Sequence, residues 1–125
     1  MRRSVLAAAA AAWLWCGTVT ATTSGDFLVK TTHDVVALCT TPESEPLYTA
    51  AVNFCHGYLV GAWQYHAAIA ARRKRDIVCL PDPPPTRSQA IQEFLTWCKA
   101  NPQYDAESPV ETLFKFLMEK WPCRK

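Results

Sequence analysis

The pair Cys55-His56 is the place in this sequence where residue types come closest to a catalytic or metal-binding arrangement. A cysteine thiolate acts as a nucleophile when a histidine accepts its proton, and both side chains can also ligate zinc. Adjacent residues of a helix point about 100° apart, so His56 in a helix does not face the sulfur of Cys55. A cysteine in a disulfide bond is not a nucleophile at all. The redox compartment of the chain therefore decides between these interpretations.

The other groups that could carry chemistry do not form a site. The three histidines, His33, His56 and His66, are scattered, and no Cys-x-x-Cys or His-x-x-x-His spacing supports a zinc site. The closely spaced carboxylates fall in a turn and beside a helix start, where acidic residues have ordinary roles, and no glycine-rich phosphate loop is present. We predict that the protein is not an enzyme and holds no metal and no cofactor.

The N-terminus has the pattern of a secretory signal peptide. Two arginines precede an apolar run that ends at Trp15, and small residues lead to Ala21. A helix that spans a bilayer needs about 20 apolar residues, so a retained anchor is the weaker alternative. The bulky residues before Cys16 argue against lipoprotein processing. We predict that residues 1–21 are cleaved and that the mature chain is periplasmic, with no membrane association.

The charge of the mature chain is balanced. The sequence has 13 Lys and Arg and 11 Asp and Glu, so removal of Arg2 and Arg3 leaves equal numbers of each sign. Nucleic-acid binding depends on excess positive charge that displaces counterions. We therefore expect a partner other than a nucleic acid.

Five of the six cysteines remain after the predicted cleavage. In an oxidising compartment, cysteines at this density form disulfides that reinforce the modest core of a small domain. The five are Cys39, Cys55, Cys79, Cys98 and Cys123.

The elements that carry these cysteines have the periodicity of helices. Residues 22–30 lack a clear pattern and are predicted to be a flexible leader, after which Thr32 caps a short helix that reaches about Thr40. A turn with two prolines leads to a long helix from Leu47 to about Arg73. Its apolar face is formed by Val52, Cys55, Leu59, Ala62, His66 and Ile69. Polar residues within this helix disfavour the alternative of a transmembrane span.

A third helix follows a proline-rich connection. Thr86 and Gln89 form a predicted capping box at its start, and Asn101-Pro102 ends it. Its apolar face consists of Ile91, Phe94, Leu95 and Cys98.

The fourth helix begins at a second predicted capping box, Ser108 with Glu111, and has Pro109 at its first position. Its apolar face consists of Val110, Leu113, Phe114, Leu117 and Trp121. Because no stretch alternates like a strand, we predict one all-α domain over residues 31–125. This domain is a small bundle of four helices stapled by disulfides.

Helix geometry suggests which cysteines pair. Cys79 lies beyond the far end of the long helix, roughly 30 Å from Cys55 at 1.5 Å per residue, so these two cannot bond. Cys39 ends the first helix near the start of the long one, which pairs it with Cys55. If the third helix runs back toward that start and the fourth helix returns, Cys123 meets Cys79. Cys98 is left as a buried free thiol, with an intermolecular bridge as the alternative.

Gly57 and Gly61 lie four residues apart and therefore share one face of the long helix. The absence of side chains there allows a neighbouring element to approach closely. The neighbour is either another part of the chain or, as a dimer seam, a second copy.

Several short motifs follow one another in a specific order. They are the Phe-Cys-x-Gly-Tyr-x-x-Gly stretch from Phe54 to Gly61, then Cys79-Leu80-Pro81, and finally Trp121-Pro122-Cys123. In this order they resemble the Rap/Tai family of amidase immunity proteins from type VI secretion systems. The resemblance covers about Thr31 to Cys123, and Cys98 is an addition to the four-cysteine pattern of that family.

The resemblance implies a periplasmic helical protein that binds a secreted peptidoglycan amidase and blocks its active site. The expected contact is the connection from Arg72 to Arg87, which Pro83-Pro84-Pro85 stiffens, because a rigid segment loses little entropy on binding. Its cations are Arg72, Arg73, Lys74, Arg75 and Arg87. The size and disulfide content also resemble small acid-activated periplasmic chaperones, which remain the alternative function.

Overall fold

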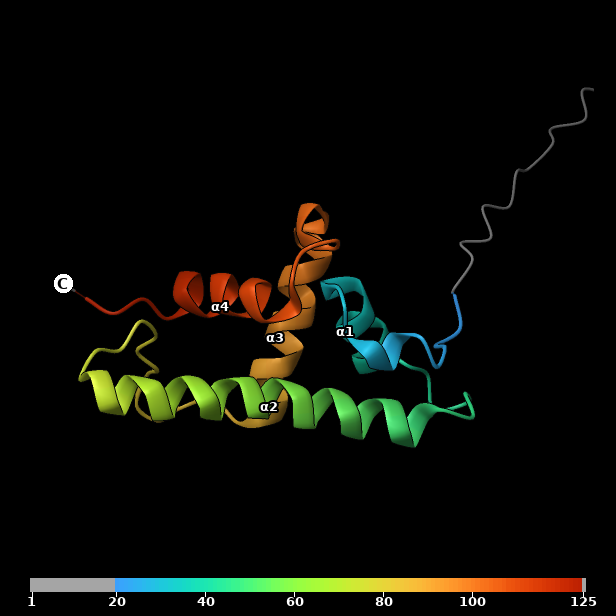
Figure 1. Ribbon diagram of the computed structural model, residues 1–125, viewed down its shortest axis with the longest axis horizontal. Coiled ribbons are helices and arrows are strands. Elements are labelled where there is room, and N and C mark those ends of the chain that lie inside the picture. The colour runs from blue at the N-terminus through green and yellow to red at the C-terminus, as the bar shows by residue number, and fades with distance from the viewer. Residues whose placement is uncertain (1–19, 125) are drawn as a thin grey trace, which may run out of the picture.

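The computed structural model describes residues 20–124, and within that range the chain is helical (Figure 1). The helices are α1 (Thr32–Cys39), α2 (Tyr48–Arg73), α3 (Arg87–Ala100) and α4 (Pro109–Lys120), with 3₁₀ turns η1 at Asp26–Leu28 and η2 at Pro102–Tyr104. Within the described range the β-structure is limited to one isolated bridge, between Val78 and Pro122. The predicted all-α class with four helices is confirmed. The predicted signal peptide lies almost wholly outside the described residues.

α1 is capped by Thr31, whereas we had predicted Thr32 as its cap. The hydroxyl of Thr31 accepts a hydrogen bond from the backbone N–H of Asp34, whose carboxylate accepts the N–H of Thr31 in return. Thr32 is fully buried. Its hydroxyl donates to the carbonyl of Glu107 and lies 2.8 Å from the hydroxyl of Thr112 on α4. Thr32 therefore belongs to the contact between α1 and α4.

α2 is a single helix, as predicted, and its burial changes along its length. The first half buries Ala51, Cys55 and Leu59, whereas the predicted apolar face is only half-buried toward the second half. α2 extends beyond the other helices at both ends in the view of Figure 1, so its second half has fewer neighbours to cover it. Within residues 20–124, no helix is both long enough and apolar enough to cross a bilayer.

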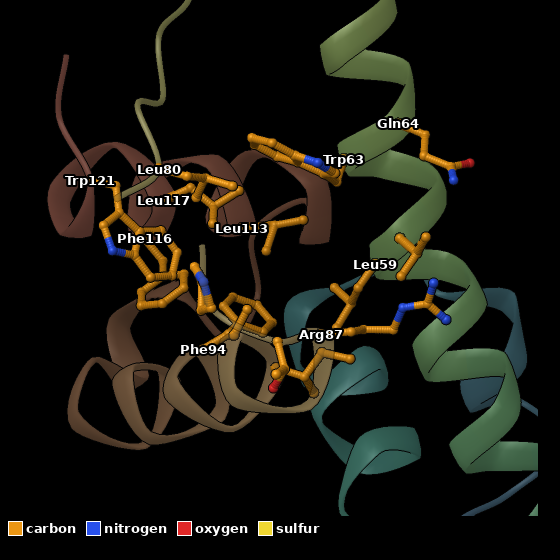
Figure 2. Close-up of a pocket in the computed structure, with 15 residues that line it drawn as sticks. Leu59, Trp63, Gln64, Leu80, Arg87, Phe94, Leu113, Phe116, Leu117 and Trp121 are labelled. Carbon is orange, nitrogen blue, oxygen red and sulfur yellow. The ribbon is translucent and has the colours of Figure 1, made fainter. Parts of the chain in front are cut away.

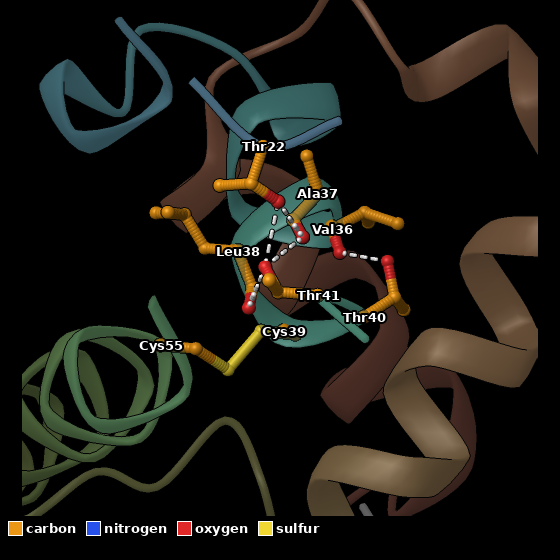
Figure 3. The surroundings of a disulfide bond; sticks show 8 residues. All are labelled: Thr22, Val36, Ala37, Leu38, Cys39, Thr40, Thr41 and Cys55. Carbon is orange, nitrogen blue, oxygen red and sulfur yellow. Dashed lines mark hydrogen bonds between the residues drawn. A yellow bond between two sulfur atoms is a disulfide. The ribbon is translucent and has the colours of Figure 1, made fainter. Parts of the chain in front are cut away.

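The predicted disulfide between Cys39 and Cys55 is present and joins the end of α1 to α2 (Figure 3). The two Cα atoms are 5.2 Å apart. Beside the disulfide, the hydroxyl of Thr41 lies 3.0 and 3.1 Å from the carbonyl oxygens of Ala37 and Leu38. The last carbonyls of a helix lack partners within the helix, and Thr41 supplies one.

Residues 22–30 fold onto the domain, although we had expected a flexible leader. The hydroxyl of Thr22 lies 2.7 Å from that of Thr41 (Figure 3). Within η1, the ring of Phe27 meets Phe54 of α2 edge-on, with 5.5 Å between the ring centroids. The sequence showed no periodicity here because a single 3₁₀ turn is too short to display one.

α3 has the predicted capping box. Gln89 N donates to the Thr86 hydroxyl, and the Gln89 side chain accepts the Thr86 N–H. The predicted face is largely buried, with Ile91, Phe94 and Cys98 inside. The direction of α3 differs from our expectation, because α3 crosses α2 steeply and does not run back along it (Figure 1).

α4 begins at Ser108-Pro109, as predicted, but the second capping box is absent. Ser108 is the N-cap residue, yet its side chain makes no capping hydrogen bond. The buried face is also rotated from the predicted one. Phe116 is 2% exposed and packs on Phe94 at 5.7 Å between centroids, whereas Val110 is 39% exposed. α4 must face both α1 and α3, and this requirement sets its rotation.

Candidate functional site

The predicted contact begins with a cationic cluster at the end of α2. Arg72 and Arg73 occupy the last helical turn, Lys74 ends the helix in a left-handed conformation with φ 50°, and Arg75 follows. All four residues are exposed. Cations at this end of a helix are favoured by the helix dipole, so the cluster lies where the backbone stabilises it. We refer to Arg72, Arg73, Lys74 and Arg75 as the basic cluster.

The chain that follows the basic cluster is attached to the end of α4. The backbone N–H of Cys79 donates to the carbonyl of Trp121 at 2.9 Å. The predicted disulfide between Cys79 and Cys123 is present, with 4.9 Å between the Cα atoms, and Val78 bridges Pro122. The segment 76–86 has no regular structure of its own, but these bonds hold it in place.

A cavity of about 370 Å³ lies between α2, α3 and α4, beneath this segment (Figure 2). Its buried lining is apolar and comes from all three helices. Trp63 of α2 and Trp121 after α4 are half-buried at its sides, and Leu80 and Pro85 of the connection complete the wall. The buried lining residues are Leu59, Ile91, Phe94, Leu113, Phe116 and Leu117.

Arg87 lies at this cavity and not within the basic cluster. It is the first residue of α3, and its side chain extends toward α2 (Figure 2). It shares the cavity with Gln64, which precedes Arg73 by nine residues, or roughly 13 Å along α2. The structure thus divides the five predicted contact cations into four at the helix end and one at the cavity.

Gly57 and Gly61 face open space. A Cβ built on either glycine meets no atom within 4 Å among the described residues. The hypothesis that these two glycines allow close approach by another part of the same chain is therefore wrong for the described residues. Beside them lies a shallow groove between α2 and α4, which we call the glycine groove. It is lined by Gly57, Tyr58, Gly61, Ala62, Tyr65, His66, Ile69, Ile77, Val110 and Phe114.

Cys55 and His66 have structural roles. The sulfur of Cys55 is bonded to Cys39, and the imidazole of His66 packs against Phe114 at 4.9 Å between centroids. Among the described residues, no group of three His, Cys, Asp or Glu side chains is arranged to hold a metal ion. The thiol of Cys98 is buried, and burial raises its pKa to about 12, with the charge of Asp105 adding to the shift. A thiol with this pKa stays protonated at neutral pH.

The cavity was missed in the sequence because its lining is scattered. Trp63 and Gln64 lie outside the predicted apolar stripe of the long helix, and Phe116 lies outside that of the fourth helix. A tryptophan on the supposedly polar face of a helix is the one signal that could have indicated a second apolar surface.

Comparison with known proteins gives one match. The family model of the Rap1a immunity proteins matches residues 31–123, which is most of the chain. No curated protein and no solved structure matches the sequence.

Proposed function

The chain belongs to the Rap1a immunity protein family, and from this membership we propose that it protects its cell by binding a type VI secreted effector. We further propose that this effector is a peptidoglycan amidase and that the protein covers its active site. Such a protein acts by binding alone and carries out no reaction of its own. Family membership also favours this function over the small acid-stress chaperone considered above.

A contact with the effector at the connection is supported by the positive charge of the basic cluster together with the bonds that hold the following chain to α4. The basic cluster is exposed, and the chain after it is joined to α4 by a disulfide and a backbone hydrogen bond. A segment that is already ordered loses little conformational entropy when it binds. We therefore propose that Arg72 to Arg87 is the surface that meets the effector.

The periplasm is the proposed compartment. Disulfides persist in oxidising compartments, and the protein has two of them. Peptidoglycan lies in that compartment, so an immunity protein exported by a signal peptide meets the enzyme where it acts.

We expect the gene beside this one to encode the amidase effector, and the test is inhibition of that effector. The purified protein is expected to suppress release of cleaved peptides from isolated peptidoglycan at a fixed molar ratio. Changing the basic cluster to alanine at all four positions should weaken binding and flatten its dependence on salt, because exposed charges act chiefly on the association rate. Affinity and rates are measured by biolayer interferometry between about 50 and 300 mM NaCl, a range over which the Debye length falls from about 14 Å to about 6 Å.

A pair of double variants controls for the loss of charge. Arg72→Ala/Arg73→Ala removes two cations of the basic cluster, and Lys30→Ala/Lys99→Ala removes two exposed cations elsewhere. Only the first pair should slow association. Equal effects of both pairs would show that net charge matters and the connection does not. Neutralisation of an effector that is not an amidase would contradict the proposed target and leave the immunity role standing.

We also propose that the glycine groove is the seam of a homodimer. Tyr65 is 72% exposed there, and Ile77 and Val110 are 40% and 39% exposed, so apolar side chains surround two glycines that nothing in the described chain covers. A second copy brings the same groove to the same place, as a two-fold interface requires.

Sedimentation velocity tests the seam. Gly61→Arg places a long charged side chain in the groove and should convert the dimer to a monomer, while Ala100→Arg, on an exposed position of α3, should not. A protein that is monomeric at about 100 μM before any substitution would overturn the seam, because a dimer with a dissociation constant of about 1 μM is largely formed at that concentration.

A further inference from the structure

We propose that the cavity between α2, α3 and α4 receives an apolar side chain of the bound effector, with an adjacent effector carboxylate paired to Arg87. This inference rests on the proposed immunity function and names a specific anchor point for it. It assigns a role to a surface distinct from the basic cluster and from the glycine groove.

The size and lining of the cavity can accommodate an apolar side chain. Its volume of about 370 Å³ is near the lower end of the range of about 300–1,000 Å³ for ligand cavities. The floor is apolar and buried, with Phe94 1% exposed and Phe116 2% exposed. An aromatic or leucine side chain that enters exchanges water for these groups, which is favourable in proportion to the apolar area covered.

The charge of Arg87 at the edge of the cavity favours an effector segment in which an acidic residue lies next to the apolar one. Among the described residues that line the cavity, Arg87 alone carries a charge. It is exposed, and no ion pair joins it to another of residues 20–124. A guanidinium beside an apolar floor can bind a carboxylate through two parallel hydrogen bonds. The occupant is thus an apolar residue next to Asp or Glu.

The position of the cavity favours the effector over a second copy of this chain. Leu80 and Pro85 belong to the proposed contact segment and also wall the cavity, so both surfaces are continuous. On α2, Trp63 lies two residues from Gly61, which places the cavity and the glycine groove about 160° apart around the helix, on nearly opposite faces. Trp and Arg are also the residues that most often anchor protein interfaces.

Filling the cavity tests the proposal. Ala90 lines the cavity from α3, and Ala90→Phe occupies its space from within. The dissociation constant for the amidase effector should rise at least about tenfold, as for the loss of an interface anchor. Ala100→Phe is the matched control, because Ala100 is an exposed alanine of the same helix outside the cavity, and it should change affinity less than about twofold.

Arg87→Glu tests the charge and does not depend on Ala90→Phe being folded. Arg87 is the first residue of α3, where an acidic side chain is favoured by the helix dipole, so this variant should retain its melting temperature. Its affinity should also fall at least about tenfold, since it opposes a carboxylate.

Fluorine NMR locates the contact. In protein labelled with 5-fluorotryptophan, effector binding should shift the Trp63 and Trp121 resonances. The Trp97 resonance should shift less, because Trp97 stacks on Tyr104 and meets the cavity only through Phe116. If the unaltered protein does not bind the effector, the proposed function fails and this inference fails with it. If the unaltered protein binds, full affinity in Arg87→Glu or an unshifted Trp63 would overturn the cavity anchor alone.

Discussion

Burial determines what the Cys98 thiol can do. The residue is 3% exposed, on the inner face of α3, and the pKa of its thiol is raised from 9.0 to about 12 by burial and by the charge of Asp105. The thiolate is the nucleophile in disulfide exchange, and this site disfavours it. Cys98 therefore acts as a small apolar side chain that does not exchange with the disulfides.

We expect Cys98 to react with a thiol reagent only after unfolding. At about pH 8, the native protein should resist Ellman's reagent for hours. In about 6 M guanidinium chloride, a concentration that unfolds even very stable domains, one thiol per chain should react within minutes. Cys98→Val should release no thiol in either condition. Rapid labelling of the native protein would show that α3 opens readily.

The same pKa shift predicts a dependence of stability on pH. Because the folded-state pKa is raised, the contribution of Cys98 is fully present below pH 9 and is lost as pH rises toward 12. The stability of the protein relative to Cys98→Val should fall across that window by about 1.4 kcal/mol per pH unit at most. Urea unfolding at pH 8, 9 and 10 measures it, and a constant difference would contradict it.

At the scale of elements, two of the four α-helix starts are capped by side chains. Thr31 and Thr86 accept hydrogen bonds from the third residue of α1 and α3, and both boxes are completed by Asp34 or Gln89. Ser108 makes no such bond, and α4 relies on Pro109 and on its packing. The same residue class thus has different energetic roles at different helices.

Substitution of the caps should reveal this difference. Thr86→Ala should lower the free energy of unfolding by about 1 kcal/mol, because it leaves a backbone N–H without its partner. Ser108→Ala should change it by less than about 0.5 kcal/mol. Urea denaturation followed by circular dichroism measures both, and equal losses would mean that the Ser108 side chain does cap α4 in solution.

The disulfide between Cys79 and Cys123 should hold the connection in place. In a Cys79→Ser/Cys123→Ser variant, we expect amide hydrogen exchange to accelerate in residues 76–86 and at the end of α4. Without the covalent bond, these two segments can separate, so local opening costs less free energy. Exchange where α1 meets α2 should stay unchanged, since the disulfide between Cys39 and Cys55 remains. Uniform acceleration would indicate global destabilisation instead.

At the scale of the whole molecule, one core unites all four helices and the N-terminal segment. Val35, Leu59, Phe94 and Leu117 come from four different helices and belong to one buried cluster, against which Phe27 packs. The contact of Thr22 with Thr41 brings the segment before η1 onto the end of α1. The chain is therefore folded from the residue that would become the mature N-terminus.

Export should yield a mature chain that begins at Thr22. Signal peptidase requires small residues before its cleavage site, and Ala21 meets that requirement. Intact-mass spectrometry of the periplasmic protein identifies its first residue. A mass lower by four hydrogens than that of the fully reduced chain reports the two disulfides. A mature chain that retains Trp13 would contradict the cleavage.

The sequence alone determined the features that depend on local structure. The disulfide between Cys79 and Cys123 was predicted correctly, but from an assumed run of α3 back along α2 that the structure does not have. By contrast, apolar spacing marked the four helices, Thr86 with Gln89 marked the start of α3, and helix length excluded a bond between Cys55 and Cys79 and favoured Cys39 with Cys55. These features follow from hydrogen bonds and side-chain contacts that span at most four residues, or from the rigid rise of a helix.

The tertiary structure decided what depends on contacts between distant residues. Whether Thr31 or Thr32 caps α1 was settled by Thr112, and the rotation of α4 was settled by the packing of Phe116 on Phe94. The steep crossing of α3 leaves the cavity at Trp63 and separates Arg87 from the basic cluster. Periodicity shows which face of a helix is apolar. The angle at which helices cross, and hence the space left between them, depends on how side chains from separate helices interlock.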